Sequence, residues 1–211
     1  MQRNSDLALA NRLADAAGEA IRPLFRGEWS QERKPDQSFV TEADRAAEAA
    51  MRAILESERA DDGIIGEEYG TRNEGAARQW VLDPIDGTTS FIAGRPIFGT
   101  LIALVQDGWP VLGLIDQPIT GERWVGRIGM PTTLNGREVY RAEGRLTLAD
   151  GTLAGADLAL GHAVRSLIHA VGEPLETALA RAISGPLALL RDDMGLGRIE
   201  SAGQPLLLFD P

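Results

Sequence analysis

Apolar residues recur at helical spacing in two stretches of the first sixty positions. They form two stripes, Leu9, Leu13, Ala17, Ile21 and Leu24, then Ala47, Met51, Ile54 and Leu55. The first stripe stops near Pro23, and Thr41 stands where it can cap the second helix. A polar loop over residues 27–38 separates the stripes. The pattern therefore predicts two amphipathic helices near the start of the chain.

Two short apolar runs then end in acidic residues. Ile64-Ile65 leads into the acidic sequence GEEYG, and Trp80-Val81-Leu82 leads into DPIDG. Runs of this length and composition predict buried strands. Acidic side chains at strand ends are placed for chemistry rather than for packing.

The pattern changes to longer β-rich runs after Phe98. The runs 99–105, 110–118 and 122–128 are separated by Asp107-Gly108 and Thr120-Gly121, which favour tight turns. This spacing predicts an antiparallel meander. The later stretch 161–183 is rich in Ala and Leu and predicts helix, interrupted at Pro174.

Composition limits the functions that these elements can serve. The 211 residues suffice for one domain, or for two small lobes that share a core. A net charge of -10 without any Lys/Arg-rich run argues against nucleic-acid binding. With no cysteine, the chain has no disulfide, thiolate zinc site or cysteine nucleophile. No apolar run is long enough to cross a bilayer, so we expect a soluble cytoplasmic protein without membrane partners.

The segment WVLDPIDGTTSF, residues 80–91, is the strongest candidate for chemistry. Asp83 and Asp86 stand three residues apart in front of a Gly-Thr-Thr turn. Oxygen ligands of this kind suit Mg²⁺, which combines one or two carboxylates with waters and substrate phosphate. Asp-Gly alone is often only a turn, Glu67-Glu68 could be a solvated pair, and Asp44 could simply favour a helix start. Three acidic clusters at strand ends and a helix start are harder to dismiss together.

Three motifs in order resemble the inositol monophosphatase family of Mg²⁺-dependent, lithium-sensitive phosphatases. They are FVTEAD at 39–44, IIGEEYG at 64–70 and WVLDPIDGTTSF at 80–91, and the continuation FIAGRPIFGTLIAL is most similar to the histidinol-phosphatase-type branch. The resemblance covers about residues 5–155. It implies an α+β fold, a layered αβαβα sandwich of mostly antiparallel sheets, with the C-terminal layer reduced. We accordingly divide the chain into an N-terminal metal- and phosphate-binding part, 1–155, and a shortened C-terminal part, 156–211.

The resemblance also implies a metal-binding role for several residues. Glu67, Asp83 and the carbonyl of Ile85 would hold one Mg²⁺ ion, and Asp83 with Asp86 would contribute to a second. Lithium is expected to inhibit.

The same resemblance implies the catalytic residues and the phosphate site. Thr88, directed toward Asp44, would orient and help deprotonate the attacking water, with Glu67 completing the catalytic set. The phosphate of a small substrate would lie against one short segment, Ile85, Asp86, Gly87, Thr88 and Thr89.

The C-terminal part departs from the family pattern. The expected second-metal Asp falls near Ile183-Ser184, and the nearest acids, Asp192 and Asp193, lie about two helical turns downstream. Two functions remain open. One is a phosphomonoesterase acting on inositol phosphate, histidinol phosphate or a similar ester. The other is a catalytically impaired homologue that binds metal or phosphate or serves an intact partner. Relatives commonly form dimers, so a homodimer is possible.

Overall fold

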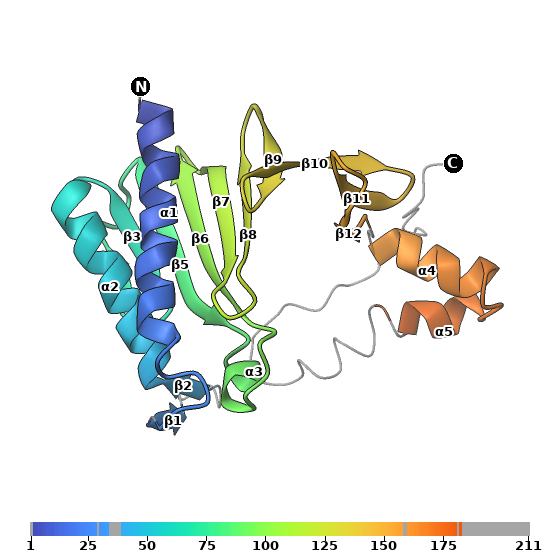
Figure 1. The fold of residues 1–211 in the computed structure, drawn as a ribbon, viewed down its shortest axis with the longest axis horizontal. Coiled ribbons are helices and arrows are strands. Elements are labelled where there is room, and N and C mark those ends of the chain that lie inside the picture. Colours follow the sequence, from blue (N-terminus) through green and yellow to red (C-terminus); the bar gives the residue numbers. More distant parts are fainter. Residues whose placement is uncertain (1, 29, 34–38, 158–159, 181, 183–211) are drawn as a thin grey trace, which may run out of the picture. The chain divides into compact units, whose positions relative to one another are not determined.

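The chain divides into two units in a computed structural model that describes residues 2–28, 30–33, 39–157, 160–180 and 182. The units are Met1–Val139 and Tyr140–Pro211 (Figure 1). The boundary after residue 155 predicted from the sequence stays a prediction. Within the described part of the chain, none of the helices is long and apolar enough to cross a membrane.

The first unit is built on a mixed sheet whose strands lie in the order β9-β8-β7-β6-β5-β3-β4. Its strands are β3 (Gly63–Gly66), β4 (Gly70–Arg72), β5 (Arg78–Asp86), β6 (Gly99–Gln106), β7 (Trp109–Gln117), β8 (Glu122–Arg127) and β9 (Met130–Leu134). β3 and β5 are parallel, whereas the strands from β5 to β9 pair antiparallel, as the predicted meander requires. β10 (Arg137–Ala142) begins by pairing with β9, and β1 (Gln31–Arg33) with β2 (Phe39–Thr41) forms a separate hairpin.

Two helices, α1 (Gln2–Ile21) and α2 (Glu42–Glu58), lie side by side on one face of this sheet (Figure 1). The predicted stripes are the buried faces: Leu9, Leu13, Ala17 and Ile21 of α1 and Ala47, Met51 and Leu55 of α2 are fully buried. They pack on alternate residues of the strands, among them Trp80, Leu82, Ile102 and Leu104. Both helix predictions are therefore confirmed, and the core lies between the helices and the sheet.

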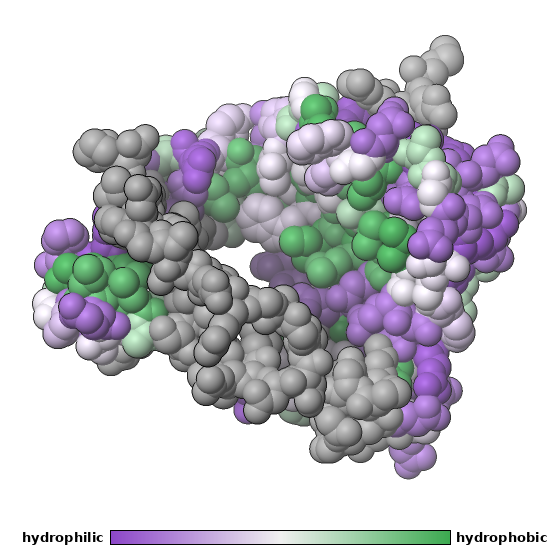
Figure 2. Space-filling model, turned by 180° about the vertical axis from the view of Figure 1, so that it is seen from behind, coloured by the Kyte–Doolittle hydropathy of each residue, from purple (hydrophilic) through white to green (hydrophobic). Residues whose placement is uncertain are grey.

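The opposite face of the sheet also presents apolar side chains. Val81, Leu101, Ile115 and Trp124 line a cavity of about 580 Å³ there, and Asp83 reaches the same cavity. Figure 2, which views the molecule from behind, shows apolar residues gathered beside charged ones. Asp83 therefore points away from the helix-covered face of its strand.

The second unit begins with a small hairpin. Its strands β11 (Arg145–Leu148) and β12 (Leu153–Ala156) pair antiparallel, and Arg141 forms an ion pair with Asp157. The helices α4 (Leu160–His169) and α5 (Leu175–Leu179) follow, and Pro174 is the N-cap of α5. The predicted interruption at Pro174 is confirmed, because proline starts a helix well but cannot continue one.

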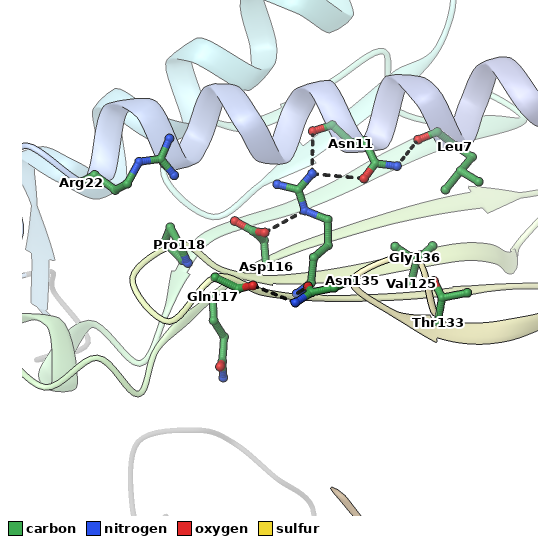
Figure 3. Close-up of a pocket in the computed structure, with 12 residues that line it drawn as sticks. Leu7, Asn11, Arg22, Asp116, Gln117, Pro118, Val125, Thr133, Asn135 and Gly136 are labelled. Carbon is green, nitrogen blue, oxygen red and sulfur yellow. Dashed lines mark hydrogen bonds and ion pairs between the residues drawn. The ribbon is translucent and has the colours of Figure 1, made fainter. Parts of the chain in front are cut away.

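Arg123 on β8 ties the sheet to α1. It donates to Asp116 on β7 at 2.7 Å, to Asp15 at 2.8 Å and to the Asn11 side chain at 3.1 Å. Figure 3 shows Asn11, Asp116 and Asn135 around this pocket, which has a volume of about 430 Å³. The polar groups of the pocket largely bond one another, and none of its lining residues is a candidate site residue. We interpret the hydrogen bonds around Arg123 as a structural link that holds α1 against the sheet.

Replacing Arg123 with Ala is expected to lower the free energy of unfolding by about 3 kcal/mol, because the buried carboxylate of Asp116 would lose its partner. Urea unfolding followed by circular dichroism measures the change. Arg12→Ala is the matched control, since Arg12 pairs with Glu58 on the exposed surface and should cost far less. Equal losses of unfolding free energy in the two variants would contradict this structural role of Arg123.

Candidate active site

The acidic motifs IIGEEYG and WVLDPIDGTTSF meet because their strands, β3 and β5, are parallel neighbours. Gly66 at the end of β3 is in register with Leu82 of β5, so the next residues, Glu67 and Asp83, emerge at the same edge of the sheet. The amide of Glu67 donates to the carbonyl of Leu82 at 3.2 Å. Glu67 and Asp83, which are separated in the sequence by β4 and its connections, are thus brought together by strand pairing.

Asp83 is crowded by negative charge. Burial is the main cause that raises its pKa to about 7, followed by the carboxylate of Glu67 and then by Asp86, while a hydrogen bond from the Ile85 amide opposes the shift. Its Oδ1 is buried and has no hydrogen-bond partner among the described residues. A buried carboxylate oxygen without a donor is costly unless a cation compensates it.

These residues fit a hard divalent cation that keeps part of its water shell. Among the described residues, no group of three or more His, Asp or Glu side chains is arranged to hold a metal ion. Mg²⁺ does not require one, because it binds through one or two carboxylates together with waters and substrate phosphate. The orphaned Oδ1 of Asp83, with Glu67 beside it, supplies that kind of donor set.

The sequence prediction placed the acids of DPIDG after their strand, but β5 continues to Asp86. Its pairing with β6 shifts register between Asp83 and Asp86, and Thr100 donates to the carbonyl of Pro84 at 2.8 Å. Proline lacks an amide donor and is tolerated in strands at such irregularities. The register of β5 against β6 therefore changes between the two acids, Asp83 and Asp86.

Asp44 joins the start of α2 to the same place. Its Oδ2 accepts from the amide of Thr41 at 2.8 Å and from the Thr41 hydroxyl at 2.5 Å, which caps α2. Its Oδ1 accepts from the hydroxyl of Thr88 at 3.4 Å, a long hydrogen bond. Burial is the main cause that raises the pKa of Asp44, the bonds from Thr41 oppose it, and the charge of Glu67 adds a smaller increase. The side chain of Thr88 therefore lies between Asp44 and the carbonyl of Ile85, which it also approaches at 3.2 Å.

A glycine turn follows the acids and begins α3 (Thr88–Ile92). Gly87 is the N-cap, with φ of 94°, in the left-handed region where glycine is favoured. A Cβ at this position would also lie 3.4 Å from the Cβ of Phe98. The first amides of a helix have no acceptor within it, so those of Thr88 and Thr89 are suited to an anion.

The structure thus brings together most of the residues singled out from the sequence. Glu67, Asp83, Asp86, Asp44 and Thr88 lie around the ends of β3 and β5 and the starts of α2 and α3. The other predicted residues of the segment, Ile85, Gly87 and Thr89, occupy the same turn. The positions considered from the sequence for the second metal site lie outside the described residues: Ile183, Ser184, Asp192 and Asp193.

Comparison with known proteins decides the family. The model of the inositol monophosphatase family matches residues 3–185. The chain belongs to the inositol monophosphatase family. The family match extends past residue 155, so it includes part of the C-terminal region that we predicted to depart from the family pattern.

Relatives of known activity or structure agree with this membership. The chain is 54% identical over 134 residues to the "Bifunctional phosphatase IMPL2, chloroplastic" of Arabidopsis thaliana, covering 63% of this chain and 39% of that protein. It is 43% identical over 122 residues to a histidinol-phosphatase of Mycobacterium tuberculosis, covering 57% of this chain and 47% of that protein. The chain thus spans half or less of the length of these two relatives.

Solved structures show the same fold. An inositol monophosphatase from Zymomonas mobilis matches with a TM-score of 0.58 and 55% identity, over 68% of this chain and 55% of that chain. The inositol monophosphatase of Thermotoga maritima matches with a TM-score of 0.61 and 28% identity, over 69% and 56%. The predicted family and its α+β fold with a mostly antiparallel sheet are confirmed.

Sequence reasoning missed Glu48, a fully buried carboxylate on α2. It stands four residues after Asp44, on the buried face that Ala47 and Met51 share. An acid inside an apolar helical stripe is the signal that could have found it, because charged residues are rarely buried without a partner. Besides Arg52, four residues on in the same helix, its partners are the amides of Glu68 and Tyr69, which no local pattern reveals.

Proposed function

We propose that this chain is a phosphomonoesterase that hydrolyses a small polyol or amino-alcohol phosphate with the help of Mg²⁺. The observation that supports it most is Asp83, whose buried Oδ1 has no partner among the described residues and whose carboxylate stands beside that of Glu67. A divalent cation would relieve both conditions. The reaction adds water to the ester and releases an alcohol and inorganic phosphate.

Glu67, Asp83 and the carbonyl of Ile85 would hold one ion, and Asp83 with Asp86 would contribute to another. When bound, the ions supply positive charge to the phosphoryl group and lower the pKa of a coordinated water. The carboxylates that hold the ions would determine where this positive charge lies relative to the phosphoryl group. Lithium is expected to inhibit, as the family resemblance implies.

Thr88 and Asp44 would handle the proton of the attacking water. The one proton of the Thr88 hydroxyl can be donated to the Ile85 carbonyl at 3.2 Å or to Asp44 Oδ1 at 3.4 Å. When it is donated to Asp44, the oxygen lone pairs of Thr88 can accept a hydrogen bond from water. Asp44 can then receive the proton that Thr88 passes on. Burial, which raises the pKa of Asp44, makes it a better proton acceptor than an exposed aspartate.

The turn at Gly87 would hold the phosphate. The amides of Thr88 and Thr89 begin α3, and Gly87 takes the left-handed backbone conformation that turns the chain into this helix. These contacts are common to any phosphate ester, so they do not select the alcohol. Histidinol phosphate and inositol phosphate are the candidate substrates because the relatives include a histidinol-phosphatase and an inositol-1-monophosphatase.

Phosphate release from a panel of histidinol, inositol, sugar and nucleotide phosphates tests the proposal. We expect Mg²⁺-dependent release from histidinol phosphate or inositol phosphate. Asp83→Asn should be inactive in the same assay. A homodimer and a cytoplasmic location remain predictions.

The second function predicted from the sequence has its own outcome. A chain that binds Mg²⁺ but releases no phosphate from any ester in the panel would be the impaired homologue, and the phosphatase proposal would then be wrong. The absence of a carboxylate at Ile183 and Ser184 favours this outcome.

A further inference from the structure

Glu48 is a buried carboxylate whose hydrogen bonds lead to one short turn. Its Oε2 accepts from the amide of Glu68 at 2.7 Å, and its Oε1 accepts from the amide of Tyr69 at 3.1 Å and from Arg52 Nε at 2.7 Å. The side chain is fully buried. Bonds from amides and a guanidinium to an ionised carboxylate are charge-assisted and stronger than neutral ones. They compensate much of the cost of burying the charge.

The turn that Glu48 holds begins with Glu67. Residues 67–69 connect β3 to β4, and Gly70 ends the connection with φ of 69°. The amide of Glu67 is bonded to Leu82 of β5, and the next two amides are bonded to Glu48. The backbone of Glu67 is thus fixed from both sides, while its side chain is exposed.

Two neighbours complete this arrangement. Arg52, which pairs with Glu48, also donates to the carbonyl of Gly70 at the far end of the turn. Gly66 leaves room for the carboxylate, because a Cβ there would overlap Glu48 Oε1. The segment 66–70 is therefore wrapped around the head of Glu48.

Packing alone does not account for a carboxylate at this position. The neighbouring buried residues of α2, Ala47 and Met51, pack the helix with apolar side chains. An apolar residue would do the same at 48 without the cost of burying a charge. Only an acceptor with two oxygens can hold both amides and Arg52 together.

We propose that Glu48 is a positioning residue for the metal site, one that sets the affinity for the divalent ion by fixing the backbone of Glu67. The inference rests on the proposed function, since it takes Glu67 as a metal ligand. A ligand held in place before the ion arrives loses little conformational entropy on binding. Changes to residues that orient metal ligands typically weaken metal binding by about 10- to 100-fold.

Mn²⁺ titrated into metal-free protein, with free Mn²⁺ followed by electron paramagnetic resonance, tests this without substrate. Glu48→Gln keeps the shape but offers only one acceptor oxygen, and its amide would face the Arg52 guanidinium or a backbone N–H. We expect its Kd for Mn²⁺ to rise about tenfold. At saturating metal the kcat should stay within about threefold of the wild type, because no group that touches substrate has changed.

Glu56→Gln is the matched control. Glu56 lies on the same helix with an exposed side chain, so its loss should leave Mn²⁺ binding unchanged. Thermal unfolding of each variant separates a loss of fold from a loss of affinity. A folded Glu48→Gln protein with the wild-type Kd would overturn the inference.

Gly66→Ala reaches the same contact from the other side. The added methyl group must displace the Glu48 carboxylate, so Mn²⁺ binding should weaken as in Glu48→Gln. Combined with Glu48→Ala, which removes the nearest obstructed group and leaves only the flexible end of Arg52 in the way, Gly66→Ala should add less than about threefold. Full additivity of the two changes would contradict a shared cause.

Asp83→Asn separates this inference from the function on which it rests. If Asp83→Asn abolishes Mn²⁺ binding and Glu48→Gln leaves it intact, the metal site is correct and the role of Glu48 is wrong. If Asp83→Asn leaves Mn²⁺ binding intact, the proposed metal site is wrong, and the role of Glu48 falls with it.

Discussion

Asp83→Asn is expected to abolish phosphate release while stabilising the metal-free protein. The substitution removes the carboxylate shared by both predicted metal ions, so the rate should fall by about 10³-fold or more, because charge stabilisation worth several kcal/mol is lost. In EDTA the same change removes a charge that burial and Glu67 disfavour. The free energy of unfolding should then rise by about 1 kcal/mol, a value kept small because solvent still reaches the side chain.

The stabilisation should depend on pH in a defined direction. The pKa of Asp83 in the folded, metal-free protein is raised to about 7, from an ordinary value of 3.8. The folded state therefore binds more protons than the unfolded state between these values, and stability falls as pH rises through this window. The advantage of Asn at 83 should be full above pH 7 and should vanish as pH falls toward 3.8.

Urea unfolding in EDTA at pH 8 and pH 4, with phosphate release measured separately, checks both effects. Asp61→Asn is the control, because Asp61 is exposed in the turn after α2 and should change neither quantity. Added Mg²⁺ should stabilise the wild type and not the Asp83 variant. An active Asp83→Asn protein would remove this residue from the metal site.

The helices and the meander could be predicted because their signals are local. Leu9 and Leu13 show the buried face of α1 through their spacing alone, and Pro174 marks a boundary through its own ring. The acidic site residues could be chosen because three motifs carry carboxylates next to strand ends and a helix start, and their individual roles came from the resemblance of these motifs to the family. Their meeting could not be derived from these patterns, since it depends on the parallel pairing of Ile64 with Trp80.

Contacts between residues far apart in the sequence could not be predicted for the same reason. Glu48 looks like any helical glutamate until the amides of Glu68 and Tyr69 are placed against it. The continuation of β5 to Asp86 depends on the pairing of Asp86 with Gly99 of β6. The run of apolar residues that ends at Leu82 does not show this pairing. In each case the missing information is which strand or helix lies beside which.

Thr88→Val should lower kcat by about 10²- to 10⁴-fold while leaving metal binding nearly unchanged. Valine keeps the branched shape of threonine but removes the hydroxyl that approaches both Asp44 Oδ1 and the carbonyl of Ile85. The loss should fall on proton transfer, because the carboxylates that hold metal are untouched. Phosphate release at saturating Mg²⁺, together with Mn²⁺ titration, separates the two steps.

Thr120→Val is the control for loss of a threonine hydroxyl, since Thr120 bonds to Gln117 on the exposed surface. Asp44→Asn should impair kcat to a similar degree, and the double variant should be little worse than either one, because the two groups act on the same proton. Asp44 also caps α2 through Thr41, so its variant should lose stability that Thr88→Val retains. A Thr88 variant with the wild-type kcat would mean that the Thr88 hydroxyl passes no proton to Asp44 and that the water is activated without it.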